Sequence, residues 1–259
     1  MVLHDDTILM IGGVGNFKNC LQLDRGTWKD HSTLTGERLD HSAVATQTAT
    51  FVFGGMQSPF TYEYLPKGSN TWLMGKTEIP GGFRGCAIAV KSGKKILLID
   101  IKKRILCFDV NDHTFQELPT ELNVKRYHHR CAYIPNTNKI MITGSIWDDS
   151  TEILDTEDES VTIASPLNSK RFSHGMGVLT INGQDRLAVF GGNSDHTSYT
   201  LLDSVELYNT RTEKWEKTDI KLTEPKRSFG FLELKLTKNV RGNQKILKNQ
   251  NPEVENWSM

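Results

Sequence analysis

The segment that decides the fold runs from Leu187 to Trp215. It begins with Leu-Ala-Val-Phe-Gly-Gly at residues 187–192 and ends with Ser-Val-Glu-Leu-Tyr-Asn-Thr-Arg-Thr-Glu-Lys-Trp at residues 204–215. The first part is a short apolar run closed by two glycines. The second part alternates apolar and polar residues before a polar turn and a tryptophan. Short runs of this kind, bounded by glycine and polar turns, are typical of antiparallel β-strands.

The same order of features recurs along the chain. Apolar runs that end in glycines, or in degenerate copies of them, occur at residues 8–13, 51–55, 96–100, 140–145 and 187–192. Their first glycine positions, 12, 54, 99, 144 and 191, are 42, 45, 45 and 47 residues apart. A repeat of about 40–50 residues with several short strands is typical of a β-propeller. Because helix-period stretches are absent, we predict an all-β fold of four-stranded antiparallel blades.

Two further features repeat with the glycines. An aromatic or apolar residue follows the third strand of most units by seven residues, as Trp215 follows Tyr208. An arginine with a histidine three residues later precedes several units, at positions 38 and 41, 126 and 129, and 171 and 174. This order resembles the kelch repeat over roughly residues 8–236. The resemblance implies a kelch-type β-propeller in which the glycines, tryptophans and arginines have primarily structural roles.

The two ends of the chain predict the number of blades. Only residues 1–3 precede the first turn, so the first blade has at most a stub of its inner strand. Residues 229–236 form a further predicted strand without a partner in their own unit. We expect this strand to pair into the N-terminal blade and to close a ring of about five blades, which removes exposed strand edges. Residues 1–236 are then one propeller and residues 237–259 a mobile tail. The alternative is a piece of a longer propeller.

The composition is that of an ordinary globular protein. The 259 residues include 31 Lys and Arg and 31 Asp and Glu, so no overall charge attracts nucleic acid or a membrane. No signal peptide is recognisable, and no run approaches the roughly 18 apolar residues of a membrane-spanning helix. Without a secretory signal, the cysteines are interpreted as reduced thiols. We expect a cytoplasmic protein. The cysteines are Cys20, Cys86, Cys107 and Cys131.

Motifs of catalysis and cofactor binding are absent from the sequence, including GxSxG, HExxH and a glycine-rich phosphate loop. His128 and His129 with Cys131 offer metal ligands, but adjacent strand residues point to opposite faces and do not easily share one metal. The kelch propellers that this chain resembles include some enzymes, among them a copper radical oxidase and a sialic-acid isomerase. The oxidase needs a Tyr–Cys pair, and no such pair stands out in this sequence. We expect no catalytic residues, metal or cofactor, and predict that the protein is not an enzyme.

Loops on a rigid scaffold are the remaining place for function. The kelch resemblance implies that they bind a partner protein, so we predict a non-catalytic interaction module, as in substrate-recognition or scaffold proteins. The alternatives are the propeller of a cullin-ligase (BTB-kelch) substrate adaptor or an actin-binding protein, and then a kelch-fold enzyme such as a sugar isomerase or oxidase. The predicted binding residues are Arg38, Arg84, Arg126, Tyr127, Trp147, Arg171, His196, Tyr199 and Arg227.

The predicted partner is an acidic or polar protein segment, because arginines make charge-assisted hydrogen bonds with carboxylates. Tyrosine, tryptophan and arginine are also the residue types enriched at binding hot spots. The alternative for each recurring arginine is that it braces the backbone carbonyls of neighbouring loops.

Overall fold

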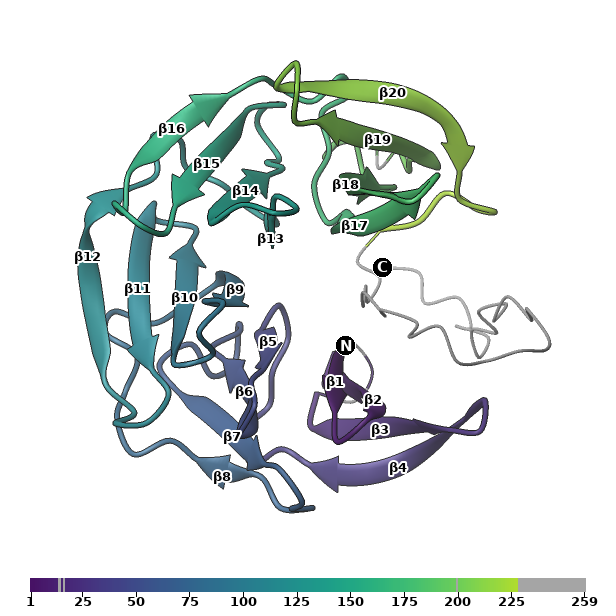
Figure 1. Ribbon diagram of the computed structural model, residues 1–259. Coiled ribbons are helices and arrows are strands. Elements are labelled where there is room, and N and C mark those ends of the chain that lie inside the picture. The colour runs from purple at the N-terminus through teal and green to yellow at the C-terminus, as the bar shows by residue number, and fades with distance from the viewer. Residues whose placement is uncertain (14, 16, 199, 228–259) are drawn as a thin grey trace.

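The computed structural model describes residues 1–13, 15, 17–198 and 200–227. In these residues twenty strands form five four-stranded antiparallel sheets, and no helix is found among them. Figure 1 shows the sheets arranged as blades around a common centre, with β1, β5, β9, β13 and β17 innermost. The prediction of an all-β, five-bladed propeller is therefore confirmed.

Each blade is a meander of four consecutive strands. Blade 1 contains β1 (Val2–His4), β2 (Thr7–Ile11), β3 (Asn19–Asp24) and β4 (Thr27–Thr33). Blade 2 contains β5 (Ser42–Ala45), β6 (Ala49–Phe53), β7 (Tyr62–Pro66) and β8 (Leu73–Met74). Blade 3 contains β9 (Gly85–Ala89), β10 (Lys95–Asp100), β11 (Arg104–Asp109) and β12 (Phe115–Glu121). Blade 4 contains β13 (Arg130–Tyr133), β14 (Lys139–Thr143), β15 (Thr151–Asp155) and β16 (Val161–Ala164). Blade 5 contains β17 (Gly175–Ile181), β18 (Gln184–Phe190), β19 (Ser204–Asn209) and β20 (Lys214–Lys221).

The first glycine of the repeat is required where one blade meets the next. Gly54 follows β6 with φ +61°, a conformation that residues with a side chain rarely adopt. A Cβ at this position would lie 2.1 Å from the carbonyl oxygen of Phe83, which belongs to the loop leading into blade 3. The next residue, Gly55, donates its backbone N–H to the same carbonyl at 3.2 Å. The glycine pair therefore allows the two blades to approach each other closely.

Blade 3 departs by one residue from the repeat positions predicted above. In blades 2, 4 and 5 the residue two before the first glycine faces the preceding blade, as Val52 does before Gly54. In blade 3 the residue that faces the preceding blade is Leu98, two before Asp100. Asp100 therefore holds the first glycine position, and the prediction that Ile99 holds it is wrong. A shift of one residue exchanges the two faces of a strand, so the structure alone fixes which side chains of blade 3 face each neighbour.

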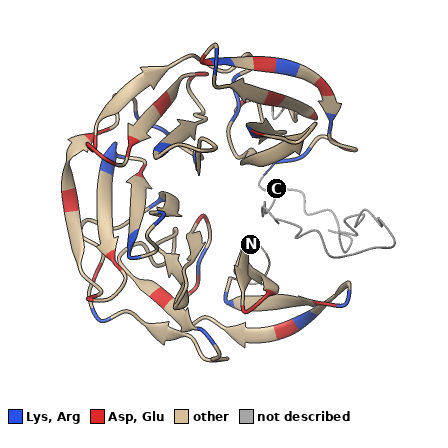
Figure 2. Ribbon diagram, viewed as in Figure 1, with Lys and Arg blue, Asp and Glu red and all other residues tan. Residues whose placement is uncertain are grey.

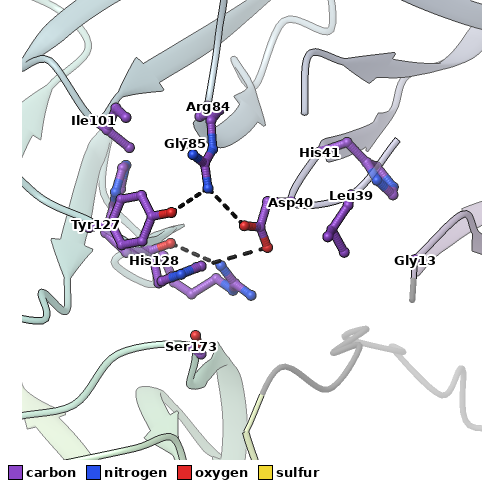
Figure 3. Close-up of a pocket in the computed structure, with 12 residues that line it drawn as sticks. Gly13, Leu39, Asp40, His41, Arg84, Gly85, Ile101, Tyr127, His128 and Ser173 are labelled. Carbon is purple, nitrogen blue, oxygen red and sulfur yellow. Dashed lines mark hydrogen bonds and ion pairs between the residues drawn. The ribbon is translucent and has the colours of Figure 1, made fainter. Parts of the chain in front are cut away.

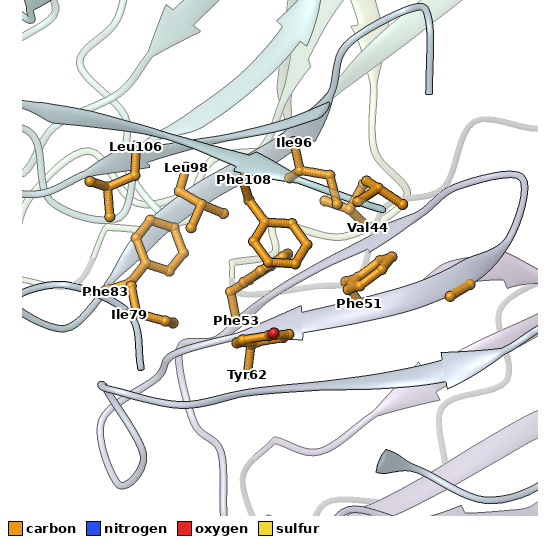
Figure 4. Packing of buried hydrophobic residues seen from close by; sticks show 12 residues of the cluster. Val44, Phe51, Phe53, Tyr62, Ile79, Phe83, Ile96, Leu98, Leu106 and Phe108 are labelled. Atoms are coloured by element: carbon orange, nitrogen blue, oxygen red, sulfur yellow. The ribbon is translucent and has the colours of Figure 1, made fainter. Parts of the chain in front are cut away.

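The apolar core is divided among the interfaces between blades. The cluster between blades 2 and 3 is aromatic, and Figure 4 shows Phe108 of β11 lying over Phe51 and Phe53 of β6. Its ring centroid is 5.4 Å from that of Phe51 and 5.2 Å from that of Phe53, in edge-on arrangements that favour such packing. Trp72 and Trp215 are each 5% exposed, in the clusters between blades 1 and 2 and blades 4 and 5. They fill the space between blades, as predicted.

The inner place in blade 1 is held by β1, which pairs with β2 through Val2 opposite Leu9. The strand predicted at residues 229–236 to take this place, and the tail predicted at residues 237–259, lie outside the described residues. Figure 2 shows acidic and basic residues distributed over all five blades, in keeping with the balanced charge. The described residues contain no helix long and apolar enough to cross a membrane.

Candidate functional site

Three of the predicted binding arginines are completely buried, and each is paired with a buried glutamate of the third strand of its blade. Arg126 is typical: its Nε donates to Oε2 of Glu152 at 2.8 Å and its Nη1 to the carbonyl of Ser150 at 2.7 Å. The three pairs are Arg38–Glu63, Arg126–Glu152 and Arg171–Glu206.

Burial decides the role of these arginines. Burial lowers the pKa of Arg38 and of Arg171 from the usual value, and the neighbouring glutamate opposes that shift. Because the side chains of Arg38, Arg126 and Arg171 are 0% exposed, a partner cannot touch them in the folded protein. The prediction that these three bind a partner is corrected: they brace the loops between blades, which was the alternative.

The glutamates were missed by sequence reasoning, although the sequence contains a signal for them. The three blades entered through the Arg-x-x-His motif each carry a glutamate near the start of the third strand, and blade 3 has neither. In blade 3 the bracing guanidinium comes from Arg104 of β11. It donates to the carbonyls of Pro80 at 2.8 Å and Gly82 at 2.7 Å, and to the carboxylate of Asp100 at 2.6 Å.

A pocket of about 260 Å³ lies where loops of all five blades converge at the inner ends of the blades, with Gly13 as the contribution of blade 1. Figure 3 shows side chains from these loops pointing toward one another. The side chains that give the pocket its chemistry are those of Asp40, His41, Arg84, Tyr127, His128 and Arg130.

Arg84 is central to the pocket. Its Nη2 donates to Oδ2 of Asp40 at 2.9 Å and also to the hydroxyl of Tyr127, as Figure 3 shows. Its guanidinium carbon lies 4.9 Å from the centre of the Tyr127 ring, within the range of a cation–π contact. The side chain is 24% exposed, and its Nε is buried without a hydrogen-bond partner among the described residues. The guanidinium is therefore held in place while part of its donor capacity is unused.

Four residues that line the pocket hold the same position of the repeat. With the corrected register of blade 3, Asp40, Arg84, His128 and Ser173 occupy equivalent positions in blades 2 to 5. Asp40, His128 and Ser173 have φ values of +56°, +58° and +52°, which are uncommon for residues other than glycine. The shared backbone position brings four different side chains to the same central space.

Positive charge dominates around this space. His128 Nδ1 lies 4.0 Å from Oδ1 of Asp40. Burial lowers the pKa of His128, as do the charges of Arg130, Arg84 and Arg227, while Asp40 opposes the shift. His128 is thus uncharged at neutral pH, and three guanidinium groups act on its surroundings against one nearby carboxylate. An anionic group is the ligand that this electrostatic environment favours.

The recurring histidines have structural contacts. Nε2 of His129 donates to the carbonyl of Ile99 at 3.0 Å, and Nε2 of His174 forms a 2.8 Å hydrogen bond with Oγ1 of Thr143. Each therefore bonds to the preceding blade. Burial lowers the pKa of His129 to about 3 and that of His41 to about 4. No group of three or more His, Cys, Asp or Glu side chains in the described part of the chain is arranged to hold a metal ion.

The remaining predicted residues lie in different places. Tyr127 lines the pocket, and Arg227 is exposed at a distance from which its charge acts on His128. Trp147 is 58% exposed after β14 and His196 is exposed after β18, and neither lines the pocket. Tyr199 lies outside the described residues. Asp40, His128 and Arg130 were missed as site residues, because their relation to Arg84 depends on the corrected register.

The comparisons with known proteins give a fold and no family. No protein-family model matches the chain, and no curated protein sequence matches it. Among solved structures, the chain is similar to a fungal alcohol oxidase with catalytic diversity among the AA5 family, in complex with copper. The TM-score is 0.66 and the identity 17%, over 86% of this chain and 53% of that one. This chain thus spans about half the length of the oxidase chain, and the likeness shows the β-propeller fold alone.

This finding corrects the prediction that the protein is not an enzyme. That prediction rested on the absence of familiar catalytic motifs, yet an alcohol oxidase has a similar propeller. A fold hosts different activities, so neither the fold nor missing motifs exclude catalysis. Among the described residues, no group of three or more His, Cys, Asp or Glu side chains is placed to hold the copper that the oxidase carries. We therefore derive no copper chemistry for the pocket.

Proposed function

We propose that the protein recognises an acidic segment of a partner protein at the central pocket, with Arg84 as the main anchor. The observation that carries the proposal is the unused donor of Arg84. Its Nε is buried without a partner while its Nη2 is held by Asp40 and Tyr127. The Nε and Nη2 donors on one side of a guanidinium form the bidentate contact that carboxylates prefer.

The contacts of Arg84 suggest how an acidic ligand binds. The carboxylate of the ligand replaces Asp40 at Nη2, and this displacement is what gives it access to the buried Nε, while Tyr127 keeps the guanidinium plane in position. Arg130 and Arg227 add positive charge that compensates for the repulsion from Asp40. A side chain already held in its binding geometry loses less conformational entropy when the ligand arrives.

Labelled peptides that contain aspartate or glutamate, each with a twin containing asparagine or glutamine, test the proposal by fluorescence anisotropy. We expect the acidic peptides to bind more tightly, and Arg84→Met to weaken that binding at least tenfold, about 1.4 kcal/mol. Arg186→Met is the matched control, because Arg186 is 26% exposed and its Nη2 pairs with Glu216 of blade 5. Equal binding of the twins, or equal effects of the two variants, would refute the proposal.

The kelch resemblance supports a protein as the source of the acidic group. A substrate adaptor and an actin-binding protein are two specific forms of this function. Cosedimentation with purified filamentous actin separates them: binding that Arg84→Met abolishes favours actin as the partner, and no binding excludes it.

A further inference from the structure

The innermost strands of blades 3 and 4 each carry a cysteine, and the two cysteines face each other. Cys86 of β9 pairs with Ile99, and Cys131 of β13 pairs with Ile142. Directly paired residues of antiparallel strands project to the same face of the sheet. Ile99 and Ile142 both pack in the apolar cluster between blades 3 and 4, with Cys86 and Cys131 packed in it too. Each cysteine therefore projects from its own blade toward the other.

The neighbouring interface shows how close these positions are. In the interface between blades 2 and 3, Ser42 of blade 2 holds the repeat position that Cys86 holds in blade 3. Ala87 of blade 3 holds the position that Cys131 holds in blade 4. There the backbone N–H of Ala87 donates to Oγ of Ser42 at 2.8 Å. The repeat thus places the side chain of the first position in contact with the second. In the interface of blades 3 and 4 the Cys86 thiol is close enough to Cys131 that, after burial, the Cys131 thiol is the next largest cause of its raised pKa.

We propose that Cys86 and Cys131 are a redox-active dithiol that closes to an intramolecular disulfide between blades 3 and 4 when the protein meets a peroxide. Cys131 is partly exposed whereas Cys86 is buried, so Cys131 reacts first. Its sulfur attacks hydrogen peroxide, the O–O bond breaks, and a sulfenic acid and one water form. The sulfur of Cys86 then attacks the Cys131 sulfur and displaces the second water. Two thiols lose two electrons, and the peroxide is reduced to two waters.

The disulfide lies directly beneath the pocket. Gly85 and Arg130, which line the pocket, are the residues immediately before Cys86 and Cys131. A disulfide requires Cβ atoms about 3.5–4.5 Å apart, so its formation fixes the separation of the two strands at this end. Burial and the nearby Cys131 thiol raise the pKa of Cys86, so the second step becomes faster as pH rises.

Thiol alkylation and peptide mapping test the proposal on the whole protein. After hydrogen peroxide treatment, we expect two of the four thiols to resist iodoacetamide in denaturant and to recover with dithiothreitol. A non-reducing peptide map should show a peptide that links Cys86 to Cys131. Cys131→Ser should abolish this peptide. Cys107→Ser is the matched control, because Cys107 is buried in the same cluster and its loss should leave the linked peptide in place.

Three results would overturn the proposal: four alkylatable thiols after oxidation, a linkage through Cys107 or Cys20, or a disulfide between two copies of the chain. The map of the wild-type protein needs no variant, so it decides the matter even if Cys131→Ser fails to fold. A test by acidic-peptide binding after oxidation would depend on the proposed function being right. The mapped disulfide does not depend on it. The two proposals therefore fail separately.

Discussion

Removal of Glu152 tests whether the buried arginines brace the propeller. Arg126 and Glu152 are both 0% exposed, with Nε and Oε2 2.8 Å apart. Glu152 also accepts a hydrogen bond from the backbone N–H of Asn123 at 2.5 Å, so one carboxylate joins the loop of residues 122–126 to β15. In Glu152→Ala the guanidinium keeps only the neutral oxygens of Ser150. Leaving one charge of a buried pair unpaired costs about 3–5 kcal/mol.

Urea unfolding followed by tryptophan fluorescence measures this loss. Because the typical stability of a protein is about 5–15 kcal/mol, we expect a large fall in the midpoint for Glu152→Ala and for Arg126→Met. The double variant should lose less than the sum of the two, because it leaves no unpaired charge, with a coupling of about 2 kcal/mol or more. The Arg186–Glu216 pair is the matched control: its 2.6 Å contact is partly exposed, so we expect less than about 1 kcal/mol.

Two results would refute the bracing role. The first is a loss below about 1 kcal/mol in either single variant, which is the range of exposed pairs. The second is additivity in the double variant, because independent losses mean that the two side chains do not compensate each other's charge.

Three further predictions concern acid stability, the blade junction and the pocket. The pKa of His129 is about 3 in the folded protein, against about 6.5 in the unfolded chain. Its contribution to the free energy of unfolding is therefore complete above pH 6.5. That contribution is lost by about 1.4 kcal/mol per pH unit as the pH falls from 6.5 toward 3. Urea midpoints at pH 7 and pH 5 should therefore differ less in His129→Gln than in the wild type; an equal difference contradicts this. Gly54→Ala should lower the melting temperature far more than Gly68→Ala, because its Cβ would meet the carbonyl of Phe83 whereas no atom lies within 4 Å at Gly68. Asp40→Asn should tighten binding of acidic peptides, since it removes a competing carboxylate from the pocket, and weaker binding by anisotropy would argue against this competition.

The repeat made the architecture predictable, and its weakest copy caused the error of register. Gly54 and Gly191 mark the ends of second strands because their positive φ and close contacts exclude other residues. Asp100 has no such signature, since it accepts from Arg104 and thereby replaces the buried ion pair of the other blades. A sequence pattern based on glycine therefore places blade 3 one residue out of register, and the error exchanges the faces of its strands.

The buried ion pairs could have been found from the sequence, whereas the pocket could not. The arginine of the Arg-x-x-His motif and a glutamate in the third strand occur together in blades 2, 4 and 5, and blade 3 has neither. This joint presence and absence indicates a contact between them. The pocket, in contrast, joins Asp40, Arg84 and His128, which are 44 residues apart at each step and share no residue type. Only the closing of the blades around a centre brings them together.

The positions that agree between blades and those that differ have separate roles. The arginine that recurs before blades 2, 4 and 5 is buried and paired, so it maintains the junction between blades and is inaccessible to a ligand. Two residues later the same loops carry Asp40, His128 and Ser173, and blade 3 places Arg84 there. These side chains differ in charge while the backbone position is constant. The recurring residues therefore maintain the β-propeller, the fold that this chain has in common with an alcohol oxidase, and the residues that differ give the pocket its charged and polar groups.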